Sequence, residues 1–125
     1  MKPIPNDIQI ITKEDFLYRR FPIAEEPKYL SFWKMVDGKK VPSSAAFKTK
    51  PGEDGLSVEL AKLTTPEKAK GNPSTFGIAE FSANIPLSAG YECVHDKKGS
   101  KAHALIIGDT NPIAKKLSRN LNAIY

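Results

Sequence analysis

The stretch YECVHDKKGSKAHALIIG, residues 91–108, carries the clearest fold signal in the chain, because two strand-like segments flank a tight loop. YECVH and AHALIIG are rich in apolar and β-favouring residues, and the basic loop between them is centred on Gly99. We therefore expect a β-hairpin here. Both histidines of the chain, His95 and His103, lie in it.

Other segments extend this pattern to a sheet. Strand-like alternation or aromatic enrichment marks four further stretches: DIQII (7–11), YLSFWKMV (29–36) before an Asp-Gly turn, LSVELAKL (56–63) and FGIAEFSA (76–83). FLYRRFPI (16–23) is ambiguous, and we expect a helical turn from Lys13 that passes into an extended segment.

Helical signals are fewer and are punctuated by caps. TTPEKAKG (64–71) has a threonine N-cap, a proline in the first turn and a closing glycine, and IPLSAG (85–90) is expected to form one turn. At the end of the chain, Asn111 is a candidate cap, and an apolar stripe follows at helical spacing: Ile113, Leu117, Leu121 and Ile124. The sequence therefore predicts a single α+β domain over 1–125, an antiparallel or mixed sheet with a C-terminal amphipathic helix packed on one face.

Composition limits the class of protein. A chain of 125 residues with 40% hydrophobic content is sufficient for one domain with one core. The longest apolar run, ALII (104–107), is too short to cross a bilayer, and MKPIPNDIQI lacks the apolar core of a signal peptide. We expect a cytoplasmic protein without a membrane partner. The only cysteine, Cys93, can form no internal disulfide and no cysteine-built zinc site.

The charge is moderately basic. Nineteen basic residues against fourteen acidic residues give a net charge of +5. This balance favours anionic partners, namely nucleic acid, a nucleotide or an acidic protein. Solvated surface lysines with no polyanion to bind are the alternative.

The two histidines are candidate catalytic residues. If the hairpin pairs around Gly99, His95 faces His103 and Cys93 faces Leu105, so the two imidazoles could exchange a proton with one substrate. The lysines of the loop could hold a phosphate, as in a metal-independent ribonuclease: Lys97, Lys98 and Lys101. The alternative is two ordinary side chains at the end of a hairpin, because a register shift of one residue would turn one ring to the other face. Without a third ligand the pair is a poor metal site, and neither a metal nor a cofactor is expected.

Two further groups are candidate ligand-binding residues. Arg19 and Arg20 follow a tyrosine, and arginine suits bidentate phosphate recognition. Since strand alternation sends them to opposite faces, we expect at most one to serve a site while the other pairs with a carboxylate. Ser43 and Ser44 precede an expected strand and can either bind phosphate or cap a turn.

The order LYRRFP, VPSSAAFK, GLSVELAKLTTPEKA and HALIIG resembles a small prokaryotic protein type, a resemblance that implies no activity. A second resemblance is to RES-type toxins, which have the ADP-ribosyltransferase-like fold. It implies an NAD-consuming activity with Arg19 on the pyrophosphate and Ser43 or Ser44 lining the nicotinamide pocket. The chain departs from that pattern, since VPSSAAFK stands where a glycine-arginine-tryptophan-asparagine stretch is expected.

These observations predict a module that binds a phosphate-bearing ligand, preferentially nucleic acid, through its basic surface. Two alternatives stay open: an enzyme that acts on a phosphodiester or nucleotide through the histidines, and a protein–protein interaction module. No oligomeric state is predicted.

Overall fold

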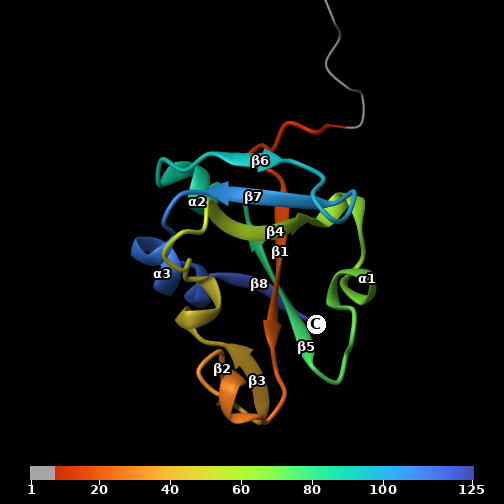
Figure 1. Ribbon diagram of the computed structural model, residues 1–125, viewed down its shortest axis with the longest axis vertical. Helices are drawn as coiled ribbons and strands as arrows, with labels where there is room; N and C mark the ends of the chain where they lie inside the picture. Colours follow the sequence, from red (N-terminus) through yellow and green to blue (C-terminus); the bar gives the residue numbers. More distant parts are fainter. Residues whose placement is uncertain (1–7) are drawn as a thin grey trace, which may run out of the picture.

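The structure, a computed structural model, describes residues 8–125 and is built on a six-stranded antiparallel sheet with short helices on both faces (Figure 1). The strand order is β6-β7-β4-β1-β5-β8, and β2 and β3 form a separate hairpin. The strands are β1 (Phe16–Pro22), β2 (Trp33–Val36), β3 (Lys39–Pro42), β4 (Gly55–Leu60), β5 (Phe76–Ser82), β6 (Cys93–His95), β7 (His103–Ile107) and β8 (Leu121–Ile124). The α-helices are α1 (Pro66–Lys70), α2 (Asn84–Ser88) and α3 (Ala114–Arg119), and the 3-10 helices are η1 (Pro27–Tyr29), η2 (Ser44–Phe47), η3 (Ala61–Leu63) and η4 (Asn111–Ile113). The predicted α+β class is confirmed.

The main core lies on the face of the sheet that α2, α3 and η2 cover. Alternate residues of the central strands point into it, among them Leu17 and Phe21 of β1, and Phe81 of β5. Phe47 of η2 packs edge-on against Phe81, with ring centroids 5.9 Å apart, and Leu117 of α3 is fully buried in the same cluster. This packing of aromatic and aliphatic side chains holds α3 on the sheet.

The opposite face is covered only in part, by α1. Tyr18, Ile78 and Ala69 of α1 form a small second cluster. The Thr65 Oγ1 atom accepts a hydrogen bond from the backbone N–H of Lys68 at 3.3 Å, which is the predicted N-cap. The rest of this face is left for the cleft described below.

A turn before β1 fixes where that central strand begins. The Asp15 carboxylate accepts a hydrogen bond from the Thr12 backbone N–H at 2.8 Å and lies 3.1 Å from Lys62 Nζ. Burial by itself would raise the pKa of Asp15, but these contacts outweigh it and hold the pKa below its ordinary value of 3.8. These contacts close a turn, and β1 follows it in place of the helical turn expected from Lys13.

Three further expectations are corrected by the structure. The C-terminal helix ends at Arg119, and the chain then forms β8, which pairs with β5 and completes the edge of the sheet. The stretch after Ser43 is the 3-10 helix η2, not a strand. The expected strand over 7–11 is absent from residues 8–11, and its first residue lies outside the described part of the chain, as does most of the MKPIPNDIQI segment. Within residues 8–125, no helix has the length and apolar character needed to cross a membrane.

Candidate functional site

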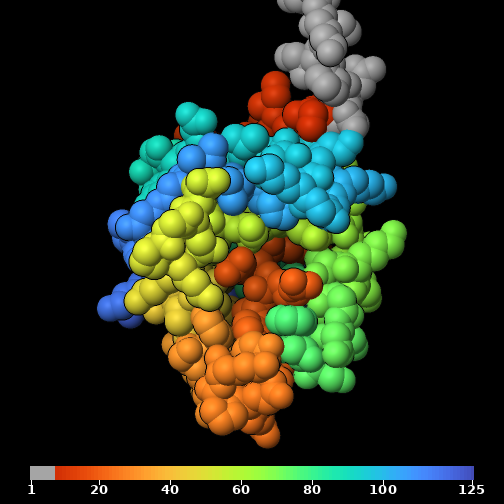
Figure 2. Space-filling view, viewed as in Figure 1, coloured from red at the N-terminus to blue at the C-terminus, as the bar shows by residue number. Residues whose placement is uncertain are grey.

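A cleft of about 420 Å³ opens on the α1 side of the sheet, where β1 and β4 separate. β1 pairs with β5 along all seven of its residues, but its register with β4 covers only Leu17 and Tyr18. Figure 2 shows the resulting hollow, with β1 at its floor, the segment before β4 on one side, the α1 region on the other and the loop before β7 above. The lining residues are Tyr18, Arg19, Arg20, Pro22, Tyr29, Phe32, Ala45, Ala46, Lys48, Lys50, Glu53, Ser57, Val58, Glu59, Ala69, Phe76, Ile78 and His103.

Arg19 bridges the gap between the separated strands. Its Nε donates a hydrogen bond to the Ala46 carbonyl at 2.8 Å, and one terminal nitrogen donates to the Ser57 carbonyl at 2.9 Å. Burial lowers the pKa of Arg19 to about 10, although the Glu53 carboxylate opposes this effect. Within residues 8–125 the guanidinium forms no ion pair with a carboxylate. Its hydrogen bonds to two carbonyls use only some of its five N–H donors. A partly buried cation with these partners is suited to hold an anion.

Arg20 lies at the other side of the cleft. Its side chain is exposed, and its Cζ atom lies 4.5 Å from the centroid of the Phe76 ring. Although strand neighbours point to opposite faces, both arginines line the cleft, because Arg19 spans the gap to β4. Neither arginine pairs with a carboxylate in the described part of the chain, in contrast to the expectation for one of them.

The charge around the cleft is mostly positive. Besides the two arginines, Lys48 and Lys50 lie on its rim and are exposed. Two carboxylates oppose them, Glu53 and Glu59, and the Glu53 carboxylate accepts a hydrogen bond from the backbone N–H of Lys50. The cleft is therefore a cationic site with an apolar wall.

The apolar wall is aromatic. Tyr29 and Phe32 come from the segment between β1 and β2, and Phe76 begins β5. All three rings are partly exposed. Rings beside cations are a common arrangement for stacking a planar heterocycle next to its phosphate.

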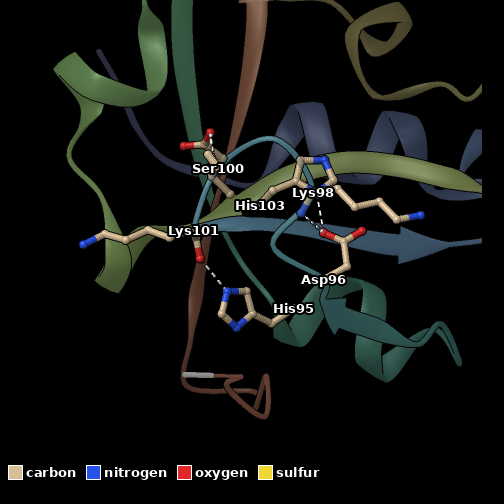
Figure 3. Close-up of polar contacts among 7 residues, drawn as sticks. His95, Asp96, Lys98, Ser100, Lys101 and His103 are labelled. Carbon is tan, nitrogen blue, oxygen red and sulfur yellow. Dashed lines mark hydrogen bonds and ion pairs between the residues drawn. The ribbon is translucent and has the colours of Figure 1, made fainter. Parts of the chain in front are cut away.

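His103 lies on the rim and is held by Asp96. The His103 Nδ1 atom is 2.5 Å from the Asp96 Oδ1 atom, and the two side chains point toward each other (Figure 3). Both side chains are mostly buried. Burial by itself would raise the pKa of Asp96, but the hydrogen bonds from His103 and from the Lys98 backbone N–H lower it below 3.8. This pair fixes the imidazole with its other nitrogen, Nε2, on the side away from the carboxylate.

His95 does not share this site. The expected register is wrong by one residue, because His95 pairs with Ala104 and Cys93 pairs with Ile106. His95 is 2% exposed; its Nδ1 accepts from the Gln9 backbone N–H at 2.8 Å, and its Nε2 donates to the Lys101 carbonyl at 2.6 Å. Both ring nitrogens are used in structural hydrogen bonds, so the predicted catalytic pair does not form.

The remaining sequence candidates lie outside the cleft lining. Ser43 donates from Oγ to the Ser31 carbonyl at 2.5 Å, and Ser44 begins η2. The three lysines of the hairpin loop also do not line it: Lys97, Lys98 and Lys101. Sequence reasoning missed Lys48, Lys50, Glu59 and the aromatic wall, because only the separation of β1 and β4 brings these residues together.

Among residues 8–125, no group of three or more histidine, cysteine, aspartate or glutamate side chains is placed to hold a metal ion. Comparison with known proteins finds no matching family model, no matching curated protein and no matching solved structure.

Proposed function

We propose that the protein binds a phosphate-bearing ligand in the cleft between β1 and β4, preferentially a nucleotide unit of nucleic acid. The observation that carries the proposal is Arg19, a partly buried guanidinium whose hydrogen-bonding partners are two backbone carbonyls. A phosphate oxygen placed at its unused N–H groups would compensate for the lost hydration of the cation.

The rest of the cleft favours a nucleotide over a bare phosphate. Small-molecule sites commonly measure about 300–1,000 Å³, and a volume of about 420 Å³ is at the low end of that range. Phe76 and Tyr29 can stack on a base, while Lys48 and Lys50 extend the positive charge toward a following phosphate.

The test is fluorescence anisotropy with a short end-labelled single-stranded oligonucleotide, as RNA and as DNA. We expect saturable binding that weakens with added salt and that a mononucleotide displaces. A poly-glutamate competitor separates this proposal from an acidic protein partner, because it has charge but neither phosphate nor base. No binding of either oligonucleotide, or displacement by poly-glutamate as effective as by the mononucleotide, would contradict the proposal.

A further inference from the structure

The His103–Asp96 pair is more than a means of closing the hairpin, because it lies at the rim of the cleft. Directly opposed residues share a face of a sheet, and His103 pairs with Glu59 of β4 on the face that carries the cleft. Figure 3 shows Asp96 and His103 pointing toward each other, while His95 lies apart. The one histidine that reaches the cleft is therefore also the one that a carboxylate orients.

The hydrogen bond determines which nitrogen is available for proton transfer. A carboxylate accepts, so the proton of the neutral ring lies on Nδ1, between His103 and Asp96 at 2.5 Å. Nε2 then carries the lone pair. The same hydrogen bond keeps the ring in this orientation while Nε2 takes up a proton.

The charged groups around the ring suit this role. Asp96 contacts it from the loop after β6, and Glu59 lies opposite on β4, where Glu59 Oε1 accepts a hydrogen bond from Ser100 Oγ at 3.3 Å. Arg19 lies in the same cleft and can stabilise the negative charge that develops on a phosphate oxygen.

We propose that His103 is the general base for hydrolysis of a phosphodiester bound in the cleft, with Asp96 as its positioning residue. The inference rests on the proposed function, since the diester is the ligand that Arg19 holds. His103 Nε2 takes a proton from a water molecule, the water oxygen forms a bond to phosphorus, and the phosphorus–oxygen bond to the leaving group breaks. The imidazolium returns its proton to the departing oxygen, so water is the only co-reactant and the products are a phosphate monoester and an alcohol.

The experiment follows hydrolysis of two probes, bis(4-nitrophenyl) phosphate and the labelled oligonucleotide used for binding. We expect both to be cleaved, and we expect His103→Ala to lower kcat by about 100-fold or more while the affinity for the oligonucleotide stays within about threefold. Added imidazole should restore part of the His103→Ala activity toward the small probe, which a structural role of His103 would not allow. Val94→Ala is the matched control, because Val94 is an exposed residue of the neighbouring strand β6 and lies outside the cleft lining.

Asp96→Asn tests the positioning role. The amide no longer selects the Nδ1-protonated ring, so kcat should fall about tenfold or more with KM unchanged, and Asp96→Glu should recover part of the loss. A wild-type protein that binds the oligonucleotide but cleaves neither probe overturns this inference and leaves the binding proposal standing. Cleavage that His103→Ala leaves unchanged, or that imidazole does not rescue, overturns it as well. If the wild-type protein does not bind the oligonucleotide at all, the proposed function itself is refuted.

Discussion

Replacing Arg19 by methionine is the sharpest test of the cleft. Methionine keeps an apolar stem of similar length, so the change removes the charge and the two hydrogen bonds to Ala46 and Ser57 with little loss of packing. Both carbonyls border the cleft, where water can replace the lost donors. We therefore expect a folded protein that has lost its anion site.

The size of the effect follows from the cost of burying the cation. Burial brings the pKa of Arg19 from 12.5 to about 10, and a fall of this size corresponds to roughly 3 kcal/mol against the charged form. An anion whose binding offsets this energy would bind more tightly by a factor on the order of 100. The side chain is partly exposed in the open cleft, and screening there reduces the gain, so we expect Arg19→Met to weaken binding by about 10- to 100-fold.

The assay is a parallel titration of Arg19→Met, Arg20→Met and Arg119→Met with the labelled oligonucleotide in about 0.1 M salt. Arg20 is exposed and should contribute about fivefold or less, whereas Arg119 is exposed on α3, outside the cleft lining, and should contribute nothing. Thermal unfolding of each variant checks that the fold is kept. A loss below about threefold for Arg19→Met, or a larger loss for Arg20→Met, would refute the reasoning.

Three further predictions concern stability and reactivity. In Gly55→Ala the new Cβ would lie 2.1 Å from the Ile106 carbonyl oxygen, so the β4–β7 ladder must open. We expect the free energy of unfolding measured in urea to fall by about 3 kcal/mol, against about 1 kcal/mol for Gly38→Ala. Equal losses in the two variants would contradict this reasoning. The pKa of Asp15 is lowered in the folded protein, so its ionised carboxylate stabilises the fold fully above the unfolded value of 3.8. This stabilisation is lost as the pH falls through the lower folded value, so Asp15→Asn should reduce the dependence of the unfolding free energy on pH at acid pH. An unchanged pH dependence would argue against the contacts described. Burial raises the pKa of Cys93 to about 11, so its reaction with an aromatic disulfide reagent at pH 8 should be slow in the folded protein and fast in denaturant, and equal rates would contradict that burial.

The parts of the fold that the sequence predicts well are those with local signals. α1 has its threonine cap and closing glycine within eight residues, and the Asp37-Gly38 turn joins β2 to β3 with positive φ at both positions. The C-terminal helix was predicted too long because the stripe from Ile113 to Ile124 continues at helical spacing. The edge of β5 also needs a partner, and pairing Ile124 with Ala79 there overrides helix propensity after Arg119.

The cleft itself was only partly predictable. Arg19, Arg20 and His103 could be named from residue chemistry, and all three line it. The carbonyls that accept hydrogen bonds from Arg19 could not be named from the sequence, because backbone acceptors have no sequence signature. The separation of β1 from β4 could not be predicted either, because it is a property of the folded sheet. Lys48 and Phe32 line the cleft for the same reason, and their segments contain no motif that predicts it.

The hairpin shows how one residue of register changes the chemistry of the site. The Asp96 and Lys97 backbone N–H groups both donate to the His103 carbonyl, at 3.2 and 3.1 Å, and Lys97 has φ 57. The ladder, in which Cys93 pairs with Ile106 and His95 pairs with Ala104, is centred between Gly99 and Ser100 and not on Gly99. The regular continuation of this register places Asp96, in place of His95, beside His103. The predicted pair of bases thus becomes a base with its orienting carboxylate, an arrangement that can activate a single water molecule, and His95 is left to hold the Gln9 backbone.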